Sequence, residues 1–224
     1  MRWALVVLFA TTLTVAPMRF ARSQAGPTIR LPAPAARGAM SVEEALHMRR
    51  SVRAFRDEEL PLAQLAQLLW AAQGITDPEG HRTAPSAGAR YPLEIYVVAG
   101  RVSGLTAGVY KYRAREHDLV RHLEGDQRSR LVQAAVGQDW IAQAPAVLAI
   151  ASVDERTRAR YRDRTERYVA IEVGHVGQNV YLQATALGLG TTMVGAFQDD
   201  SVAAVLHLDR AERPVGLMPV GRPQ

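Results

Sequence analysis

The residues best suited to chemistry are three arginines and a serine within five positions, Arg49-Arg50-Ser51-Val52-Arg53. Guanidinium groups donate several hydrogen bonds in a fixed fork, and a serine hydroxyl adds another, so together they can surround a phosphate. The same cluster also suits a solvated basic helix end, where positive charge complements the helix dipole. The pattern alone therefore indicates either a phosphate site or an ordinary basic surface.

A helix that begins at Ser41 would deliver this cluster. Ser41-Val42-Glu43-Glu44 fits a capping box, in which the serine closes the helix start and the glutamate reaches back to it. The arginines would then lie at the far end of the helix. Its predicted apolar face carries Val42, Ala45, Leu46 and Met48.

The longest apolar-periodic segment runs from Tyr168 to Phe197. Its apolar residues recur three or four positions apart, which places them on one stripe of a helix of about twenty residues, roughly 30 Å long. The stripe consists of Val169, Val173, Val176, Val180, Ala184 and Leu187. The opposite face carries Ile171, Gly174, Gly177 and Ala186, which predicts burial on more than one side. Gly188 and Gly190 should end the helix, and Thr191 to Phe197 should form a short buried strand and then a loop that a ligand can approach.

Further elements follow from apolar periodicity and from turn residues. A second amphipathic helix is expected over 62–73, ended by Gly74, and shorter helices over 127–136 and 201–206. Strands are expected over 93–98, 109–112, 119–122, 146–151 and 215–220. The charged segment 156–167 should face solvent, and a Gly-, Pro- and Ser-rich loop should span 77–92.

The composition excludes several classes of function. A chain of 224 residues without cysteine fits one domain and has neither disulfides nor thiolate sites. The net charge of +5 favours anionic ligands, but no dense basic face predicts a nucleic-acid partner. Six scattered histidines and one isolated pair with E-x-x-H spacing, Glu172 and His175, predict no metal site.

Common catalytic motifs are missing from the sequence. It contains no Walker loop, H-E-x-x-H or G-x-S-x-G, and Gly188-Leu189-Gly190 lacks the third glycine of the dinucleotide fingerprint. A chain without an obvious nucleophile or acid/base pair suits an enzyme whose cofactor supplies the reactivity.

Residues 1–25 have the composition of a signal peptide. Arg2 precedes an apolar run from Trp3 to Ala16, and Ser23-Gln24-Ala25 offers a cleavage site. The run is short for a membrane span, so we expect an exported protein, periplasmic or secreted, without stable membrane association after cleavage. An uncleaved anchor or a start at Met18 is the alternative, and without a signal the protein would be cytoplasmic. Residues 26–40 should form an extended Pro/Ala-rich arm, and 41–224 the folded domain.

Five blocks in order resemble the nitroreductase family of FMN flavoproteins, and more narrowly its thiazoline/oxazoline (azoline) dehydrogenase branch. The blocks are Leu31-Pro32-x-Pro34, R-R-S-V-R-A-F ending at Phe55, P-S-A-G-A-R-Y-P-L-E-I-Y-V-V, R-Y-V-A-I-E-V-G-H-V-G-Q-N-V-Y-L-Q-A-T-A-L-G-L-G, and M-P-V-G-R-P. The resemblance implies an α+β fold in which helices flank a mixed sheet. It also implies an intertwined homodimer that holds FMN at its interface, with the long central helix at the dimer core.

The resemblance also implies a set of cofactor-binding residues. Arg49, Ser51 and Arg53 would hold the FMN phosphate and ribityl chain with Arg50 beside them, and Arg53 would also approach the N1/O2 edge of the ring. A loop contacting FMN from the second subunit would supply Pro85, Ser86 and Gly88. The backbone facing flavin N5 would come from Gly195 and Ala196, and a last phosphate contact from Arg222.

One position departs from the azoline dehydrogenase pattern. That branch uses a Lys-Tyr pair in catalysis, and the counterpart here is Arg160-Tyr161. Arginine stays protonated and cannot replace lysine as a base, so catalysis would rest on the flavin, with Tyr161 as the remaining candidate.

The predicted function is NADH- or NADPH-driven reduction of nitroaromatic, quinone or related acceptors in two half-reactions. One alternative is a flavin-dependent azoline dehydrogenase or oxidase acting on modified peptides. Another is a non-catalytic exported binding module on the same fold.

Overall fold

The computed structural model describes residues 26–224, and a seven-stranded sheet with the order β1-β4-β3-β2-β5-β7-β6 forms its centre. The strands are β1 (Thr28–Arg30), β2 (Leu93–Ala99), β3 (Gly108–Arg113), β4 (Asp118–Glu124), β5 (Ala146–Ser152), β6 (Gly190–Thr191) and β7 (Arg213–Gly221). All these neighbours pair antiparallel. Among the described residues, parallel pairing is limited to the isolated bridges Ser51–Thr191 and Leu60–Val102. The predicted signal segment 1–25 lies outside the described residues and stays a prediction.

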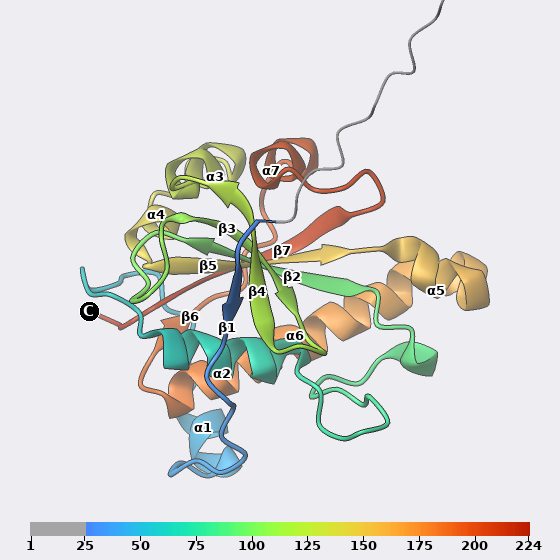
Figure 1. Ribbon diagram of the computed structural model, residues 1–224, viewed down its shortest axis with the longest axis horizontal. Helices are drawn as coiled ribbons and strands as arrows, with labels where there is room; N and C mark the ends of the chain where they lie inside the picture. Colours follow the sequence, from blue (N-terminus) through green and yellow to red (C-terminus); the bar gives the residue numbers. More distant parts are fainter. Residues whose placement is uncertain (1–25) are drawn as a thin grey trace, which may run out of the picture.

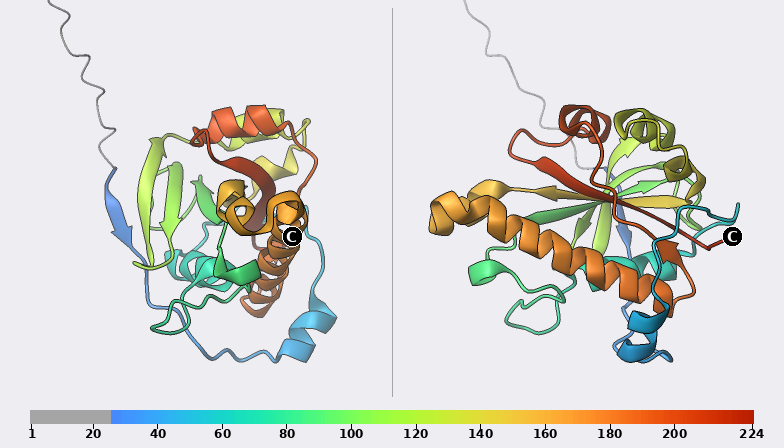
Figure 2. Two further views of the ribbon diagram at one scale, coloured as in Figure 1. Left: turned by 90° about the vertical axis from the view of Figure 1, so that its right-hand side faces the viewer. Right: turned by 180° about the vertical axis from the view of Figure 1, so that it is seen from behind.

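Helices cover both faces of the sheet (Figure 1). On one face lie α2 (Leu62–Gln73) and the long helix α6 (Thr165–Ala186), and on the other lie α3 (Arg128–Ala134), α4 (Trp140–Gln143) and α7 (Asp199–Leu206). The helix α5 (Asp154–Tyr161) and a short 3₁₀ turn, Arg162–Arg164, lead into α6 at one end of the molecule (Figures 1 and 2). The arrangement confirms the predicted α+β fold with helices on both sides of the sheet.

Alternating side chains of the central strands build two cores. From β2, Ile95 and Val97 join the cluster that packs under α2 and α6, whereas Tyr96 and Val98 join the cluster under α3, α4 and α7. Successive residues of a strand point to opposite faces, so a strand covered on both sides must be apolar at every position. This explains the continuous apolar run of β5, whose residues are all buried.

The helix α6 follows the predicted stripe. Val169, Val176, Val180 and Ala184 are buried in the core beneath the sheet. Gly188 takes a positive φ of 68° directly after the helix, as expected for a glycine that ends it. Part of the opposite face is left uncovered by residues 26–224, since Ile171 is 48% exposed and a side chain at Gly174 would meet no atom within 4 Å.

The helix α1 (Val42–Met48) shows the serine half of the predicted capping box, but it is not packed as predicted. The Ser41 hydroxyl oxygen accepts a hydrogen bond from the Glu44 backbone N–H at 3.0 Å. Of its apolar residues only Ala45 is buried, however, and the exposed ones are Val42 at 63%, Leu46 at 52% and Met48 at 51%. The helix projects from the body of the molecule (Figure 1), and none of residues 26–224 covers most of its apolar surface.

Three local features differ from the sequence-based expectations. The predicted arm begins with β1, which pairs with β4 at the sheet edge, and Leu31 enters the core, so the domain boundary at Ser41 is not a structural break. The short helix α4 was not predicted. The strand expected after Gly190 is limited to the two residues of β6, because only these two pair regularly with β7.

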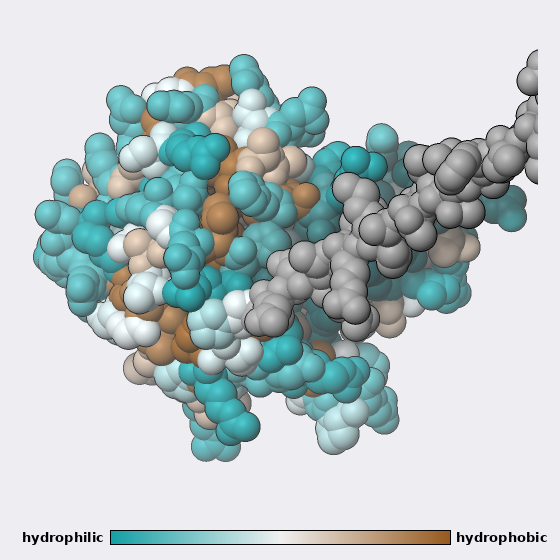
Figure 3. Space-filling view, turned by 45° about the horizontal axis from the view of Figure 1, so that its top comes forward, coloured by the Kyte–Doolittle hydropathy of each residue, from teal (hydrophilic) through white to brown (hydrophobic). Residues whose placement is uncertain are grey.

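The face in Figure 3 is mainly hydrophilic, with apolar side chains gathered in small areas between polar ones. None of the helices within residues 26–224 combines the length and the apolar character needed to cross a membrane.

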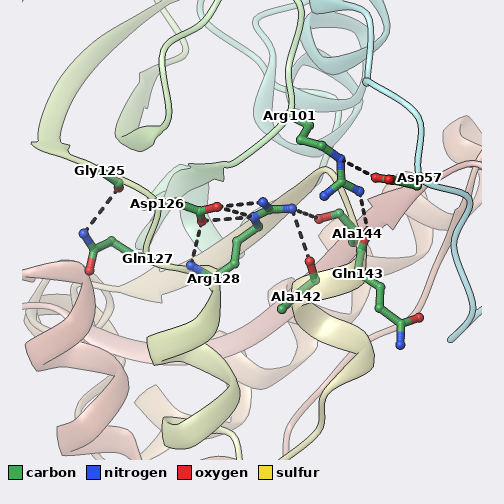
Figure 4. A network of polar contacts seen from close by, with 9 residues as sticks. All are labelled: Asp57, Arg101, Gly125, Asp126, Gln127, Arg128, Ala142, Gln143 and Ala144. Carbon is green, nitrogen blue, oxygen red and sulfur yellow. Dashed lines mark hydrogen bonds and ion pairs between the residues drawn. The ribbon is translucent and has the colours of Figure 1, made fainter.

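A buried arginine fixes the loops beside the segment that follows α1 (Figure 4). Arg128 is 8% exposed; its guanidinium donates to both carboxylate oxygens of Asp126 and to the carbonyl oxygens of Ala142 and Ala144, the last at 2.7 Å. Arg101 donates to the Gln143 carbonyl at 2.9 Å and lies 3.1 Å from an Asp57 carboxylate oxygen. These contacts hold α4 near the chain that carries the arginine cluster.

Arg128→Met should lower the free energy of unfolding by about 2 kcal/mol, because Asp126 and the carbonyls of Ala142 and Ala144 lose their donor in a mostly buried place. Arg130→Met is the control on the same helix, since Arg130 is exposed, and should change it by less than about 0.5 kcal/mol. Urea unfolding followed by circular dichroism measures both, and equal losses would contradict the role assigned to Arg128.

Candidate functional site

The arginine cluster lies against the edge strand β6. The Val52 backbone N–H donates to the Thr191 carbonyl oxygen at 3.0 Å, and Ser51 and Thr191 form a parallel bridge. The approach is close, because a Cβ added at Gly190 would lie 2.7 Å from the Val52 Cβ, so only glycine fits there. The segment after α1 therefore extends the sheet edge.

The C-terminal arginine is brought to the same edge. Gly221 of β7 pairs with Gly190 of β6, which puts Arg222 next to the turn that ends α6. The Arg56 backbone N–H donates to the Arg222 carbonyl at 2.9 Å. We call the three adjoining segments 49–56, 188–193 and 220–223 the edge platform. Of the predicted site residues, it contains Arg49, Arg50, Ser51, Arg53 and Arg222.

The arginines of the edge platform are not equivalent. Arg50 turns back to its own helix end, where one guanidinium nitrogen donates to the carbonyls of His47 and Arg49 at 2.8 Å. Arg222 lies 3.2 Å from a carboxylate oxygen of Glu58. Arg49 and Arg53 have no acidic partner within residues 26–224, and Arg53 lies 5.8 Å from the centre of the Trp140 ring. Arg49 and Arg53 are therefore the charges most available to an anion.

A buried hydroxyl supports a ligand at this place. Thr191 is 1% exposed, so its side-chain oxygen is buried. No described residue makes a hydrogen bond to this oxygen. Buried polar atoms rarely lack a partner in a folded protein, so this hydroxyl can take a hydrogen bond from a ligand or a water. Thr191 pairs with Ser51, whose own hydroxyl is exposed. Two guanidinium groups with nearby hydroxyls fit a phosphate-bearing cofactor.

The loop with Pro85, Ser86 and Gly88 lies elsewhere, along α6 and α5. The Pro85 carbonyl lies 3.4 Å from His175 of α6, and the Ser86 hydroxyl accepts from the Tyr91 N–H at 2.8 Å. Gly88 has a positive φ of 58°, and a Cβ there would lie 2.6 Å from the Tyr161 hydroxyl oxygen. The structure thus brings the loop 85–88 to Tyr161.

A single chain does not bring this loop to the arginine cluster. The loop contacts the face of α6 that carries Glu172, whereas the residue nearest to Ser51 on α6 is Tyr181. Nine residues of helix correspond to about 14 Å and two and a half turns, so these two contacts lie on opposite faces of α6. The two groups of predicted site residues therefore face away from each other.

Gly195 and Ala196 follow the edge platform directly. Gly195 lines a cavity of about 590 Å³ together with Val169 and Val173 of α6 and with Phe197. The Ala196 carbonyl accepts from the Gln138 side chain at 2.9 Å. These two residues follow the segment 188–193 of the edge platform and are exposed.

Glu172 and His175 contact the loop that follows α2. Glu172 is 2% exposed and accepts from Gln73 at 3.4 Å; burial raises its pKa, although hydrogen bonds from Ser86 and Gln73 oppose the rise. Arg82 donates to Gln73 at 2.7 Å. No group of three or more potential metal-binding side chains occurs in the described part of the chain. This buried cluster ties the loop after α2 to α6.

Sequence reasoning missed two residues beside the edge platform, Thr191 and Tyr181. Thr191 fell in a segment expected to be an ordinary buried strand. Tyr181 belongs to neither the apolar stripe nor the small-residue face of the predicted helix. An aromatic hydroxyl shortly before the glycine-rich turn was the available signal.

Comparison with known proteins places these features in a family. The family model described as "Nitroreductase family" matches residues 46–222. The chain is 51% identical over 183 residues to MJ1384 of Methanocaldococcus jannaschii, which is named as a nitroreductase; the match covers 82% of this chain and 91% of that protein. A solved Ralstonia eutropha structure, also named as a nitroreductase, is 31% identical with a TM-score of 0.78 and covers 88% of this chain and 90% of that one.

A more distant relative is named for the processing of microcin B17. The microcin B17-processing protein McbC of Escherichia coli is 27% identical over 168 residues, which are 68% of this chain but only 58% of McbC.

Thr191→Val should leave the unliganded protein as stable as wild type or stabilise it by up to about 1 kcal/mol, because it removes a buried hydroxyl without a partner. Thr165→Val is the matched control, since the Thr165 hydroxyl donates to the Arg162 carbonyl at 2.5 Å and its loss should cost about 1 kcal/mol. Thermal unfolding without ligand compares the two. A larger loss for Thr191→Val would show that its hydroxyl is satisfied in the free protein.

Proposed function

Because the chain belongs to the nitroreductase family of oxidoreductases, we propose that it binds FMN and uses NADH or NADPH to reduce nitroaromatic, quinone or related acceptors. The observation that carries the proposal is the edge platform, where Arg49, Arg53 and Ser51 adjoin the buried Thr191 hydroxyl. Within residues 26–224 the two arginines have no acidic partner and the hydroxyl has no hydrogen-bond partner. This donor set suits the phosphate of a mononucleotide.

Each part of the platform has a proposed task. Arg49 and Ser51 hold the phosphate, Arg222 approaches it from the C-terminal end, and Arg53 offsets negative charge at one edge of the ring. The backbone at Gly195 and Ala196 lies beside the ring. Bound FMN supplies the two-electron redox chemistry that the side chains of the chain lack.

A second copy of the chain would complete the site. The loop 85–88 and the edge platform lie on opposite faces of α6, so a two-fold arrangement could place the loop of one chain over the platform of the other. The surface available for such an interface carries exposed apolar side chains. It includes Ile171 and the open face at Gly174 on α6, and the exposed apolar residues of α1. A homodimer is therefore part of the proposal, and export through residues 1–25 is another part.

Peptide oxidation is the second candidate function. The similarity to McbC favours it, and so does Arg160-Tyr161, since the Arg160 guanidinium lies 3.2 Å and the Tyr161 hydroxyl 2.6 Å from a Cβ added at Gly88. Arginine cannot act as a proton acceptor at neutral pH, so this pair can bind an anion or a peptide carbonyl but cannot supply a base. This chemistry places reduction of a small acceptor ahead of azoline oxidation.

The purified full chain should take up FMN, and the flavin absorption should bleach when NADH or NADPH is added without oxygen. Exchanging both Arg49 and Arg53 for alanine should weaken FMN binding by about 1.5 to 3 kcal/mol for each lost charge-assisted contact. Arg130→Ala removes an exposed arginine of α3, outside the edge platform, and should keep wild-type affinity. Anaerobic stopped-flow absorption and a flavin titration measure both effects. Flavin reducible only by dithionite would support a non-catalytic binding module instead.

Ile171→Asp should convert the dimer to monomers, because it places a charge at the centre of the apolar surface that two copies would bury. Val136→Asp is the control, since Val136 is 62% exposed but lies beyond α3 on the other side of the sheet. Light scattering after gel filtration gives the mass of each variant. A wild-type monomer that binds FMN normally would contradict the two-chain site.

A further inference from the structure

Tyr181 lies between the two parts of the edge platform that approach opposite ends of the proposed cofactor. It belongs to the last turns of α6 and is half-buried. The Arg49 guanidinium lies 5.2 Å from the centre of its ring, within the range of a cation–π contact. Its hydroxyl group contacts both Ser51, on the phosphate side, and the segment 192–193 that leads to the loop with Gly195.

The hydrogen bonds of this hydroxyl can be assigned by direction. Its oxygen accepts from the Met193 backbone N–H at 2.8 Å, and its proton goes to the Thr192 side-chain oxygen at 3.3 Å. A phenol has one proton to donate, so the Ser51 hydroxyl, 3.3 Å away, must be the donor in the Ser51–Tyr181 contact. In the free protein the Ser51 proton is therefore directed at Tyr181.

The local charges favour this arrangement. Burial alone would raise the pKa of Tyr181, but its hydrogen bonds with Ser51, Thr192 and Met193 and the charge of Arg49 outweigh burial and lower it. The surroundings of the phenol oxygen therefore favour negative charge on it, and the hydrogen bond from the Met193 N–H holds the Met193 backbone in place.

We propose that Tyr181 is a positioning residue that couples the phosphate end of the cofactor site to the 193–196 loop. This inference rests on the proposed function, since it takes Ser51 as a phosphate contact. A bound phosphate would draw the Ser51 proton away from Tyr181, and the phenol oxygen would then have only the Met193 N–H to accept. The hydrogen bond from the Met193 N–H to Tyr181, which fixes the 193–196 loop, would therefore be strengthened only when the phosphate is present.

The coupling predicts a difference between the binding of FMN and the binding of riboflavin. Riboflavin has the ring of FMN but no phosphate, so it would leave the Ser51 proton on Tyr181. Removing the Tyr181 hydroxyl should consequently weaken FMN binding more than riboflavin binding. A role limited to general stability would weaken both to the same extent.

Tyr181→Phe in the full chain should lower the affinity for FMN about tenfold and the affinity for riboflavin by less than about threefold, as measured by quenching of flavin fluorescence. Tyr110→Phe is the matched control. Tyr110 is a buried core tyrosine whose hydroxyl donates to the Thr106 carbonyl at 2.7 Å, far along the chain from the platform. Loss of the Tyr110 hydroxyl should leave the ratio of the FMN affinity to the riboflavin affinity unchanged.

Two further measurements distinguish the proposed coupling from simple misfolding of the Tyr181→Phe variant. Ser51→Ala should lower the same ratio, and the double variant Ser51→Ala/Tyr181→Phe should lose no more than the larger single loss, because both changes break one coupled unit. Hydrogen exchange at the Met193 amide should slow when FMN is added to wild type, and riboflavin should slow it less.

The outcomes separate the inference from the function on which it rests. Wild-type protein that binds neither flavin overturns the proposed function together with the inference. A Tyr181→Phe variant that binds FMN and keeps the wild-type ratio overturns the inference alone. Additive losses in the double variant would also overturn it, since they would show that Ser51 and Tyr181 act independently.

Discussion

The architecture of the site depends on the pairing of β6, a strand of only two residues. On one side β6 pairs with β7, and on the other the Ser51–Val52 segment adds to it through the Thr191 carbonyl. Three segments that lie far apart in the sequence meet there, and their backbone groups satisfy one another. The approach is possible because Gly190 has no side chain to meet Val52. Without this contact the arginine cluster would be the exposed end of a short helix.

The helix α6 separates two groups of proposed cofactor-binding residues within one chain. One of its faces supports the edge platform through Tyr181, and another supports the loop 85–88 through Glu172 and His175. A rigid helix keeps these two surfaces apart, so a pocket that uses both needs a second molecule. The exposed apolar side chains of α1 and the open stretch around Gly174 fit that requirement, since isolated monomers rarely leave such surfaces uncovered.

Much of the fold could be predicted because its signals are local. The periodicity of 62–73 gave the bounds of α2, the continuous apolar run gave β5, and the glycine-rich turn gave the end of α6. The Ser41 cap was correct for the same reason. The packing of α1 could not be predicted, because an apolar stripe does not say whether the same chain covers it.

The site was predictable only in part, and the reason is again distance along the chain. The arginine cluster was visible as a motif, but its contact with Thr191 is a pairing across about 140 positions that no local pattern encodes. The family resemblance supplied that link for Arg49, Ser51 and Arg222. It did not supply Tyr181, because a half-buried tyrosine within a helix looks like a packing residue until its hydroxyl is seen between two loops.

A crystal structure of the full chain grown with FMN would test the account most directly. The account predicts that the phosphate lies within hydrogen-bonding distance of Arg49 and Ser51, while the ring lies between the loop at Gly195 and the Gly88 loop of a second copy. A phosphate bound away from the edge platform would contradict it, and so would a ring enclosed by both loops of one chain.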